Sequence, residues 1–284
     1  MSRYRALPSL FGAILLLLSG CGKDTRSEIA SANQPRGTLP SEQILKIGNG
    51  SEAQDLDPQA VTGVTEHRII AALFENLVSE DPKDLHPIPG LAESWDISAD
   101  GKVYTFKLRP NLKWSNGDPI LASEMVESYK RALSPKLASE YAYLIYNFVV
   151  GAKDFFEEKI SDFGQVGFKA PDEQTLQVTL QNPTPYLLKI IASHNAWTPV
   201  PVKVVTKFGA LDQKRTAWTR AGNLVGSGPF LLKEWSAHQR IVVTRNPNYW
   251  DAKTVRLDGI HFLPTEDIST DERNFRTGQV HMTY

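Results

Sequence analysis

The sequence predicts a mixed α/β fold, because two kinds of hydrophobic spacing occur in one chain of ordinary globular composition. Between residues 103 and 109 every second side chain is apolar (Tyr104, Phe106 and Leu108), which is the period of a half-buried strand. Between residues 66 and 78 apolar side chains recur every three or four positions, as in a helix that faces a core. Of the 284 residues 41% are hydrophobic and 22% are charged, close to globular averages, so most of the chain is expected to fold.

The charge balance and the single cysteine exclude several classes of protein. With 31 basic and 32 acidic side chains the chain lacks the basic excess of a nucleic-acid-binding protein. One cysteine permits neither an internal disulfide bond nor a CxxC metal site. The histidines show no metal-ligand spacing, and no GxSxG motif is present. We therefore expect no nucleic-acid partner, no metal and no cofactor, and we interpret as surface or structural residues His67, His86, His194, His238, His261 and His281.

Residues 1–20 have the pattern of an export signal, in which Arg3 and Arg5 precede an apolar run at 10–18 and then small residues. The sequence LSGC at 18–21 is similar to a bacterial lipobox, and this similarity implies acylation of Cys21 and its release as the mature N-terminus. Two or more acyl chains anchor a protein stably, so no transmembrane helix is needed. A plain secretory signal with a coincidental cysteine is the alternative. Residues 21–43 are polar and predict a flexible, lipid-anchored tether.

The folded part is predicted to begin near residue 44, with a strand at 44–47 and a helix at 66–78. The strand at 104–108 comes next, and helices are expected at 123–133 and at 140–156. The inward faces of the first two helices are predicted to carry Ile69, Ile70, Leu73, Phe74 and Leu77, and Val126, Tyr129 and Leu133.

The remaining segments continue the mixed pattern. Strands are expected within 166–180, and the proline-stiffened piece at 198–201 is suited to carry the chain from one lobe to another. A helix at 269–277 should end at Gly278. The acids at its start (Glu266, Asp267, Asp271 and Glu272) favour the positive end of the helix dipole, rather than a calcium site. Further strands are expected at 226–235, 240–250, 260–264 and from 280 onward, so the chain stops inside a strand and an unfinished domain is expected.

A GxGxxA match at residues 48–53 follows the first predicted strand. In a dinucleotide-binding protein this turn opens directly into a helix whose N-terminus meets the pyrophosphate. Pro58 interrupts any such helix within its first turns, so we set this function aside.

Taken together, several ordered segments resemble the family 5 extracellular solute-binding proteins, in the oligopeptide-binding lipoprotein branch of ABC importers. The resemblance covers residues 45 to 284 without a large gap. Two departures are visible: Thr65 stands where the branch commonly has proline, and Leu121 where a Ser or Thr usually caps a helix, so Ser123 is expected to cap instead. The segments are NGSEAQDLDP (49–58), GVTEHRIIAALFENLV (63–78), PGLAESWDISADGKVYTFKLRPNLKWSNGDP (89–119), SEYA (139–142), RIVVTRNPNYW (240–250) and FRTGQVHMT (275–283).

The resemblance implies an α/β fold of the type II periplasmic-binding-protein class, with a ligand cleft between two lobes and an extra subdomain on the first lobe. Residues 44–74 and 200–284 would form the first lobe, which is incomplete, and residues 75–199 the subdomain. Family members are about twice as long, so the second lobe is expected to be missing and the chain to be an N-terminal fragment.

The resemblance also implies a function and a site. Oligopeptides would pair with the backbone at Thr62, Gly63 and Val64, while Tyr141 packs at the ligand; Gly226, Ser227 and Gly228 lie near the cleft in this interpretation. The protein would perform no chemistry, act as a monomer, and deliver peptide to permease subunits from the periplasmic or extracellular face of the membrane that holds Cys21. The residue that binds the peptide amine would lie in the missing lobe. Without the resemblance, Tyr141 reads as a core aromatic and the glycines as turn residues.

Two other functions stay open. The same fold could bind dipeptides, cell-wall peptides or nickel chelates. An exported lipoprotein hydrolase could instead use an acid pair such as Glu66 and Asp57.

Overall fold

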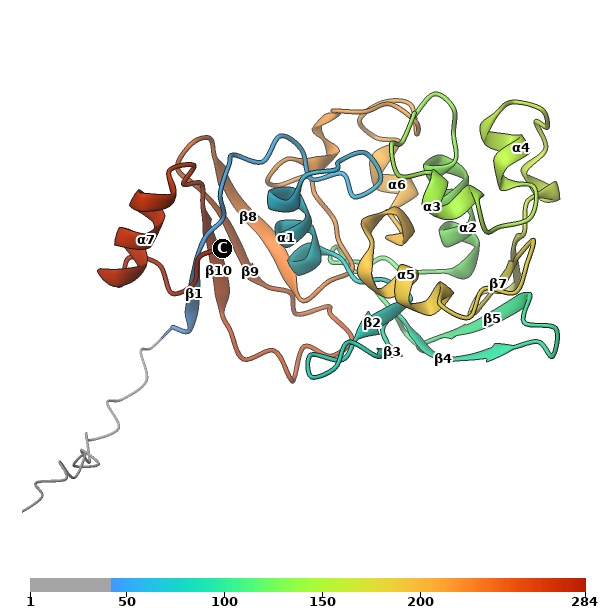
Figure 1. Cartoon of the computed structure of the whole chain (residues 1–284), viewed down its shortest axis with the longest axis horizontal. Helices are drawn as coiled ribbons and strands as arrows, with labels where there is room; N and C mark the ends of the chain where they lie inside the picture. Colours follow the sequence, from blue (N-terminus) through green and yellow to red (C-terminus); the bar gives the residue numbers. More distant parts are fainter. Residues whose placement is uncertain (1–41) are drawn as a thin grey trace, which may run out of the picture. The chain divides into compact units, whose positions relative to one another are not determined.

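The computed structural model describes residues 42–284, which form one compact unit. The predicted signal at 1–20, the lipidation site Cys21 and most of the tether lie outside the described residues. Two four-stranded sheets and a two-stranded sheet are combined with helices, so the predicted mixture of helices and strands is confirmed (Figure 1).

The first four-stranded sheet joins the start of the described chain to its end. Its order is β1 (Ile44–Gly48), β10 (Gly259–Leu263), β9 (Arg240–Arg245) and β8 (Phe230–Ser236). β1 runs parallel to β10, and the other pairs are antiparallel. Helix α1 (Val64–Leu73) contacts β8 and buries Ile69, Ile70 and Leu73, as predicted.

The second four-stranded sheet is antiparallel throughout, in the order β4 (Ala92–Ile97), β5 (Val103–Leu108), β7 (Thr175–Thr179) and β6 (Phe168–Asp172). The alternation predicted for β5 is confirmed, because Tyr104, Phe106 and Leu108 are all buried. Helix α2 (Ala122–Ala132) packs on β6 and β7. The small hairpin of β2 (Val78–Glu80) and β3 (Pro87–Pro89) lies beside α5 (Leu187–Ser193) (Figure 1).

Three predictions about helices are wrong in detail. α1 ends at Leu73 rather than at residue 78, because Phe74 is extended and the carbonyls of Asn76 and Leu77 accept bonds from residues 90–92 instead. The helix predicted at 140–156 is two short ones, since Gly151 adopts a left-handed φ of 68° between them. Ser123 does not cap α2: it lies inside the helix, and the N-cap is Leu121, whose side chain makes no cap bond. The two short helices are α3 (Tyr143–Tyr146) and α4 (Ala152–Phe156).

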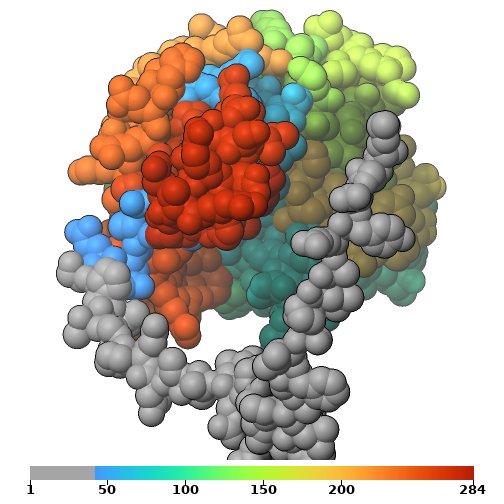
Figure 2. Space-filling model, turned by 60° about the vertical axis from the view of Figure 1, so that its left-hand side comes forward, coloured from blue at the N-terminus to red at the C-terminus, as the bar shows by residue number. Residues whose placement is uncertain are grey.

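The C-terminal elements agree more closely with the sequence. Helix α7 (Ile268–Arg276) has Asp267 as its N-cap, and the Asp267 carboxylate accepts from the Thr270 amide at 2.7 Å. Gly278 lies just beyond the end of the helix with a φ of 74°. Figure 2 shows this segment on the surface of the molecule. The strand expected from residue 280 is only an isolated parallel bridge between Met282 and Ile47. The remaining short elements are η1 (Phe163–Gln165), η2 (Asn195–Trp197), α6 (Val202–Val205) and η3 (Ala217–Thr219).

Two hydrophobic clusters form the interior. One comprises buried residues between Leu77 and Trp197, and the other comprises buried residues up to Phe74 and from Val200 onward. A buried polar seam joins them, in which the guanidinium of Arg131 on α2 binds the Asp57 carboxylate. The division of the chain into a lobe and a subdomain stays a prediction. None of the helices in the described part combines the length and the apolar content needed to span a bilayer.

Candidate functional site

The segment that leads into α1 is an exposed stretch of extended backbone with free hydrogen-bonding groups. Gly63 is the N-cap of α1, with φ −78° and ψ 147°, and Val64 is 65% exposed. Among the described residues, no hydrogen bond is made by the N–H or C=O of Thr62, by the N–H of Gly63 or by the N–H of Val64. Backbone groups of this kind are available to an extended ligand strand.

Interactions of the preceding residues hold the same segment rigidly in place. The Asp57 carbonyl accepts from the Ala60 and Val61 amides at 3.0 and 3.2 Å, and the Asp57 carboxylate is fixed by Arg131. At Gly63 a Cβ atom would collide with the Glu66 carboxylate, so this position admits only glycine without a shift. Residues 62–64 are therefore held in a fixed position, and we call this segment the edge.

Two cavities flank this edge. The smaller, of about 220 Å³, is lined by residues 61–64, His67, Tyr141 and residues 193–195; we call it the imidazole cavity. It brings Thr62, Gly63 and Val64 together with Tyr141, although 77 residues separate Val64 from Tyr141 in sequence (141 − 64). Tyr141 is half-buried, and its ring meets the His194 ring edge-on with centroids 4.4 Å apart.

The larger cavity, of about 440 Å³, lies on the same edge and is lined by charged residues. Glu66, Glu140, Lys214 and Arg215 all contribute to it. Lys214 donates to the Ala138 carbonyl at 2.8 Å, whereas the exposed Arg215 side chain has no polar partner among the described residues. This charged cavity was not predicted, because its cationic residues come from a loop with no recognisable motif.

The turn at Gly226, Ser227 and Gly228 is placed elsewhere, against the end of α1. The Gly228 amide donates to the Leu73 carbonyl at 2.9 Å, and the Ser227 hydroxyl accepts from the Glu75 amide at 2.9 Å. A Cβ atom at Gly228 would lie 2.6 Å from the Phe74 nitrogen. None of the three residues lines either cavity at the edge, so the structure gives them a packing role, and a role in binding stays a prediction.

Glu75, which the sequence analysis missed, lies at the centre of a polar cluster beside this turn. Its carboxylate accepts from the Tyr249 hydroxyl at 2.9 Å and from the Trp250 indole at 2.6 Å. Burial raises the pKa of Glu75 to about 7, against the opposing effect of these donors and of Arg109. Glu75 also lines a third cavity, of about 390 Å³, together with His67 and Asn195. The partners are about 175 residues apart, and no local spacing could have joined them.

The acid pair considered for a hydrolase has structural partners. Asp57 is fully buried against Arg131, so it is closed to a substrate. Glu66 is also buried and accepts from the Gln54 amide and from the Thr65 hydroxyl, both at 2.9 Å. The hydroxyl that replaces the commoner proline at residue 65 thus helps to hold Glu66.

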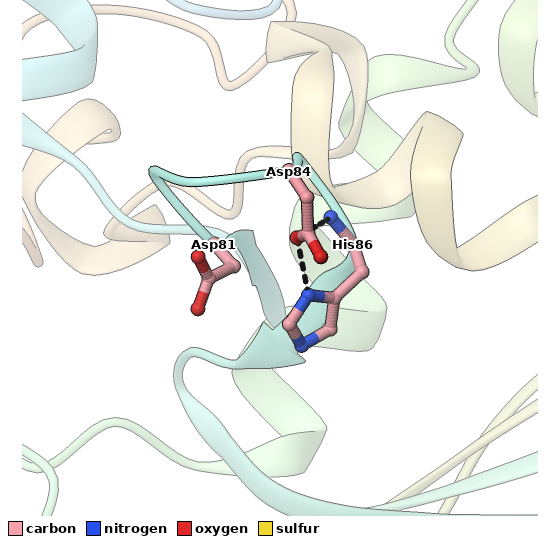
Figure 3. Close-up of side chains that lie close together, drawn as sticks. All are labelled: Asp81, Asp84 and His86. Carbon is pink, nitrogen blue, oxygen red and sulfur yellow. Dashed lines mark hydrogen bonds and ion pairs between the residues drawn. The ribbon is translucent and has the colours of Figure 1, made fainter.

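One group of side chains on the loop between β2 and β3 has atoms suited to a metal ion. The ligand atoms of Asp81, Asp84 and His86 lie within 4.8 Å of one another (Figure 3). The Asp84 carboxylate is already bonded to the His86 ring at 2.5 Å, and Asp84 and His86 are exposed. The hydrogen bond with His86 lowers the pKa of Asp84. The group is explained as a loop-closing pair, and the expectation of no metal site stays a prediction.

The fold and the family agree. Residues 86–284 match the model of the bacterial extracellular solute-binding proteins, family 5 Middle, and the chain therefore belongs to this family of extracellular solute-binding proteins.

The particular relatives are peptide-binding proteins. The chain is 43% identical over 256 residues to the periplasmic oligopeptide-binding protein OppA of Escherichia coli, which covers 89% of this chain and 45% of that protein. Among solved structures, Haemophilus influenzae OppA in complex with the peptide RPPGFSPFR matches with a TM-score of 0.79 and 36% identity, covering 86% of this chain and 46% of that one. The Escherichia coli murein tripeptide binding protein MppA matches with a TM-score of 0.78 and 32% identity, covering 84% and 45%. The chain spans about half the length of the curated relatives it matches.

Proposed function

We propose that the protein is the substrate-binding component of an ABC importer, which captures oligopeptides and delivers them to the membrane permease. The observation that carries this proposal is the rigid edge at residues 62–64, where four backbone groups are free beside a cavity that contains Tyr141. Relatives named for oligopeptide binding support it.

Backbone recognition explains how one site can accept many peptides. All peptides share their amides, so a strand-like pairing takes affinity from groups that do not vary with sequence. Alternate side chains of an extended strand point to opposite sides. The two cavities that flank the edge therefore suit successive ligand side chains, and no chemical step is required of the site.

A substitution of one amide tests the proposal directly. Val64 is the first residue of α1, where proline is favoured because its missing N–H has no acceptor within the helix. Gly63 has an extended backbone, as the residue before a proline prefers. Val64→Pro should thus remove one ligand donor and leave the fold intact.

The measurement is calorimetric titration of the protein encoded by the complete gene with a pool of mixed short peptides. We expect Val64→Pro to weaken binding by about five- to tenfold, which corresponds to the loss of one hydrogen bond of roughly 1 to 1.5 kcal/mol. Val64→Ala, which keeps the amide, is the matched control and should lose far less. Equal losses in the two variants, or no binding by the unmodified protein at millimolar peptide, would count against the proposal.

The proposal includes an envelope location, a monomeric state and a lipid anchor at Cys21. Tethering beside an importer raises the effective concentration of loaded protein at the permease. Mass spectrometry of the mature N-terminus tests the anchor: an unmodified Cys21 still joined to Gly20 would remove it without affecting the peptide site.

A second candidate keeps the fold and narrows the ligand to cell-wall peptides. The relative named for murein tripeptide binding favours it, at 32% identity. Comparison of a murein tripeptide with ordinary tripeptides by calorimetry separates the two candidates.

A further inference from the structure

The imidazole cavity has an unusual set of ionisable groups. Among the described residues, its lining contains no carboxylate, lysine or arginine. In this part of the chain, the lining side chains that can change charge are His67, His194 and Tyr141. Near neutral pH this cavity can therefore gain positive charge but cannot become negative, in contrast to the charged cavity on the other side of the edge.

His194 is held neutral by its surroundings. Its Nδ1 accepts a hydrogen bond from the Ala196 amide at 3.1 Å, so this nitrogen carries no proton and Nε2 carries one. Burial lowers the pKa of His194, and the neighbouring His67 adds to this effect. Protonation would break the bond that caps η2, so His194 acts as a neutral N–H donor.

His67 is oriented by one side-chain hydrogen bond, which uses only one of its two ring nitrogens. Its Nδ1 lies 2.9 Å from the Asn195 side-chain oxygen, which can only accept, so Nδ1 carries a proton. The other ring nitrogen has no hydrogen-bond partner among the described residues, so a proton on it leaves this bond intact. The ring is exposed at the cavity, and Asn195 beneath it is buried and supports both charge states.

We propose that the imidazole cavity is a subsite for an acidic ligand side chain, in which protonated His67 binds the carboxylate and neutral His194 donates a hydrogen bond. This inference rests on the proposed function, because the edge at residues 62–64 must first align the peptide. It adds a side-chain preference, and a pH dependence, to a site that otherwise reads only backbone.

Other charged groups face His67 and must be separated from its effect. On α1, Glu66 is held by Gln54 and Thr65, and Arg68 is stacked 3.4 Å from the Tyr284 ring centroid. Across the third cavity lie Glu75, Glu80 and Tyr249. Glu75 must be tested separately, because its pKa of about 7 lies within the pH range of the experiment. The ionised Glu75 carboxylate would also repel an acidic ligand at high pH. Glu75→Gln removes that contribution.

The experiment uses tripeptides of alanine with one glutamate at the first, second or third position, and the same three with glutamine. Each is titrated calorimetrically at pH 5.5 and pH 8.0 into the protein encoded by the complete gene. For at least one position we expect the affinity for the glutamate peptide to rise about three- to tenfold from pH 8.0 to pH 5.5, relative to the change in affinity for its glutamine partner.

The variants assign the effect to a residue. His67→Asn keeps a donor toward Asn195 but cannot become charged, so the glutamate-to-glutamine difference in pH dependence should vanish. Glu75→Gln should retain it, and so should His86→Asn, a substitution of an exposed histidine outside the lining of the imidazole cavity. Peptide binding with no such difference, its persistence in His67→Asn, or its loss in Glu75→Gln would overturn the inference while leaving the proposed function standing. Absence of binding by every peptide at both pH values would count against the proposed function itself.

Discussion

The edge at residues 62–64 and the turn at residues 226–228 are both short glycine-containing segments, yet their backbones are used in opposite ways. At the edge the amides of Thr62, Gly63 and Val64 have no partner among the described residues, and Val64 is exposed. At the turn Gly226 exchanges bonds with Ser115, and Gly228 bonds to Leu73. Gly63 lets the Glu66 carboxylate lie close beneath the free edge, whereas Gly228 lets its own main chain pack against the main chain at the end of α1.

This difference teaches that a glycine in a sequence can indicate that another group approaches the backbone closely. It does not indicate whether that group is a side chain or another main chain. At Gly63 the nearby group is the Glu66 side chain, and at Gly228 it is the backbone at the end of α1. Only the position of distant segments decides whether the backbone is free for a ligand. Four substitutions can break or sharpen the contrast.

The largest effect is expected from Arg131→Met, which removes the support behind the edge. Arg131 is 1% exposed, and its loss would leave the Asp57 carboxylate buried without its cation. Removing one partner of a buried pair costs about 3–5 kcal/mol. Because Asp57 also holds the Ala60 and Val61 amides, we expect both unfolding free energy and peptide affinity to fall.

Denaturant unfolding and calorimetry check this together. Unfolding should occur at lower denaturant concentration, and the folded protein should bind peptide more weakly. Stability lost with affinity unchanged would show that the edge does not depend on the seam.

Gly228→Ala is expected to cost stability alone. The added methyl group would lie 2.6 Å from backbone atoms of both Leu73 and Phe74, which cannot move without disturbing the end of α1. Overpacking of this kind costs about 1–3 kcal/mol. The melting temperature should drop, while peptide affinity measured well below it should stay within about twofold. A large loss of affinity would place the turn at the ligand, as expected from the family resemblance.

Unlike the two preceding substitutions, Glu75→Gln should increase the free energy of unfolding at alkaline pH. The pKa of Glu75 in the folded protein, about 7, lies above its value of 4.5 in an unfolded chain, so folding favours the protonated acid. Stability from this group is full below pH 4.5, falls as pH rises toward 7, and stays low above it. The amide keeps a neutral acceptor for Trp250 and can donate to Tyr249 instead.

We therefore expect Glu75→Gln to be more stable than the unmodified protein at pH 8, by on the order of 1–2 kcal/mol after allowance for partial exposure, and nearly equal at pH 5. Chemical unfolding at the two pH values measures this. A constant difference across pH would mean that the carboxyl group does not titrate in this range.

Local patterns predicted the elements well and the joins between them poorly. The alternation at Tyr104, Phe106 and Leu108, and the helix that ends before Gly278, need only neighbouring residues, and both were confirmed. The split of the 140–156 helix depends on Gly151, where a Cβ atom would lie 2.7 Å from the Gln165 carbonyl oxygen. That contact arises from tertiary packing, which the hydrophobic periodicity of the sequence does not reveal.

The candidate site shows the same limit. The edge residues and Tyr141 were found through a resemblance, and the structure places them on one cavity. His67 and His194 were interpreted as surface or structural because the histidines show no metal-ligand spacing. The two lie 127 residues apart (194 − 67), so nothing in the sequence indicates that they share a cavity. Glu75 carried no signal, since its charge is perturbed by tertiary burial and by donors from the far end of the chain.

The smallest effect is expected from Thr62→Ala, which isolates backbone from side chain at the edge. The Thr62 side chain is exposed and makes no hydrogen bond among the described residues, whereas its N–H and C=O are the free groups. Surface substitutions of this kind change stability by no more than about 0.5 kcal/mol. If the ligand reads only the backbone, the affinities for glutamine tripeptides should also stay within about twofold by calorimetry. A loss of tenfold would mean that the hydroxyl contacts the peptide, and the edge would then select ligands by side-chain contact as well as by strand pairing.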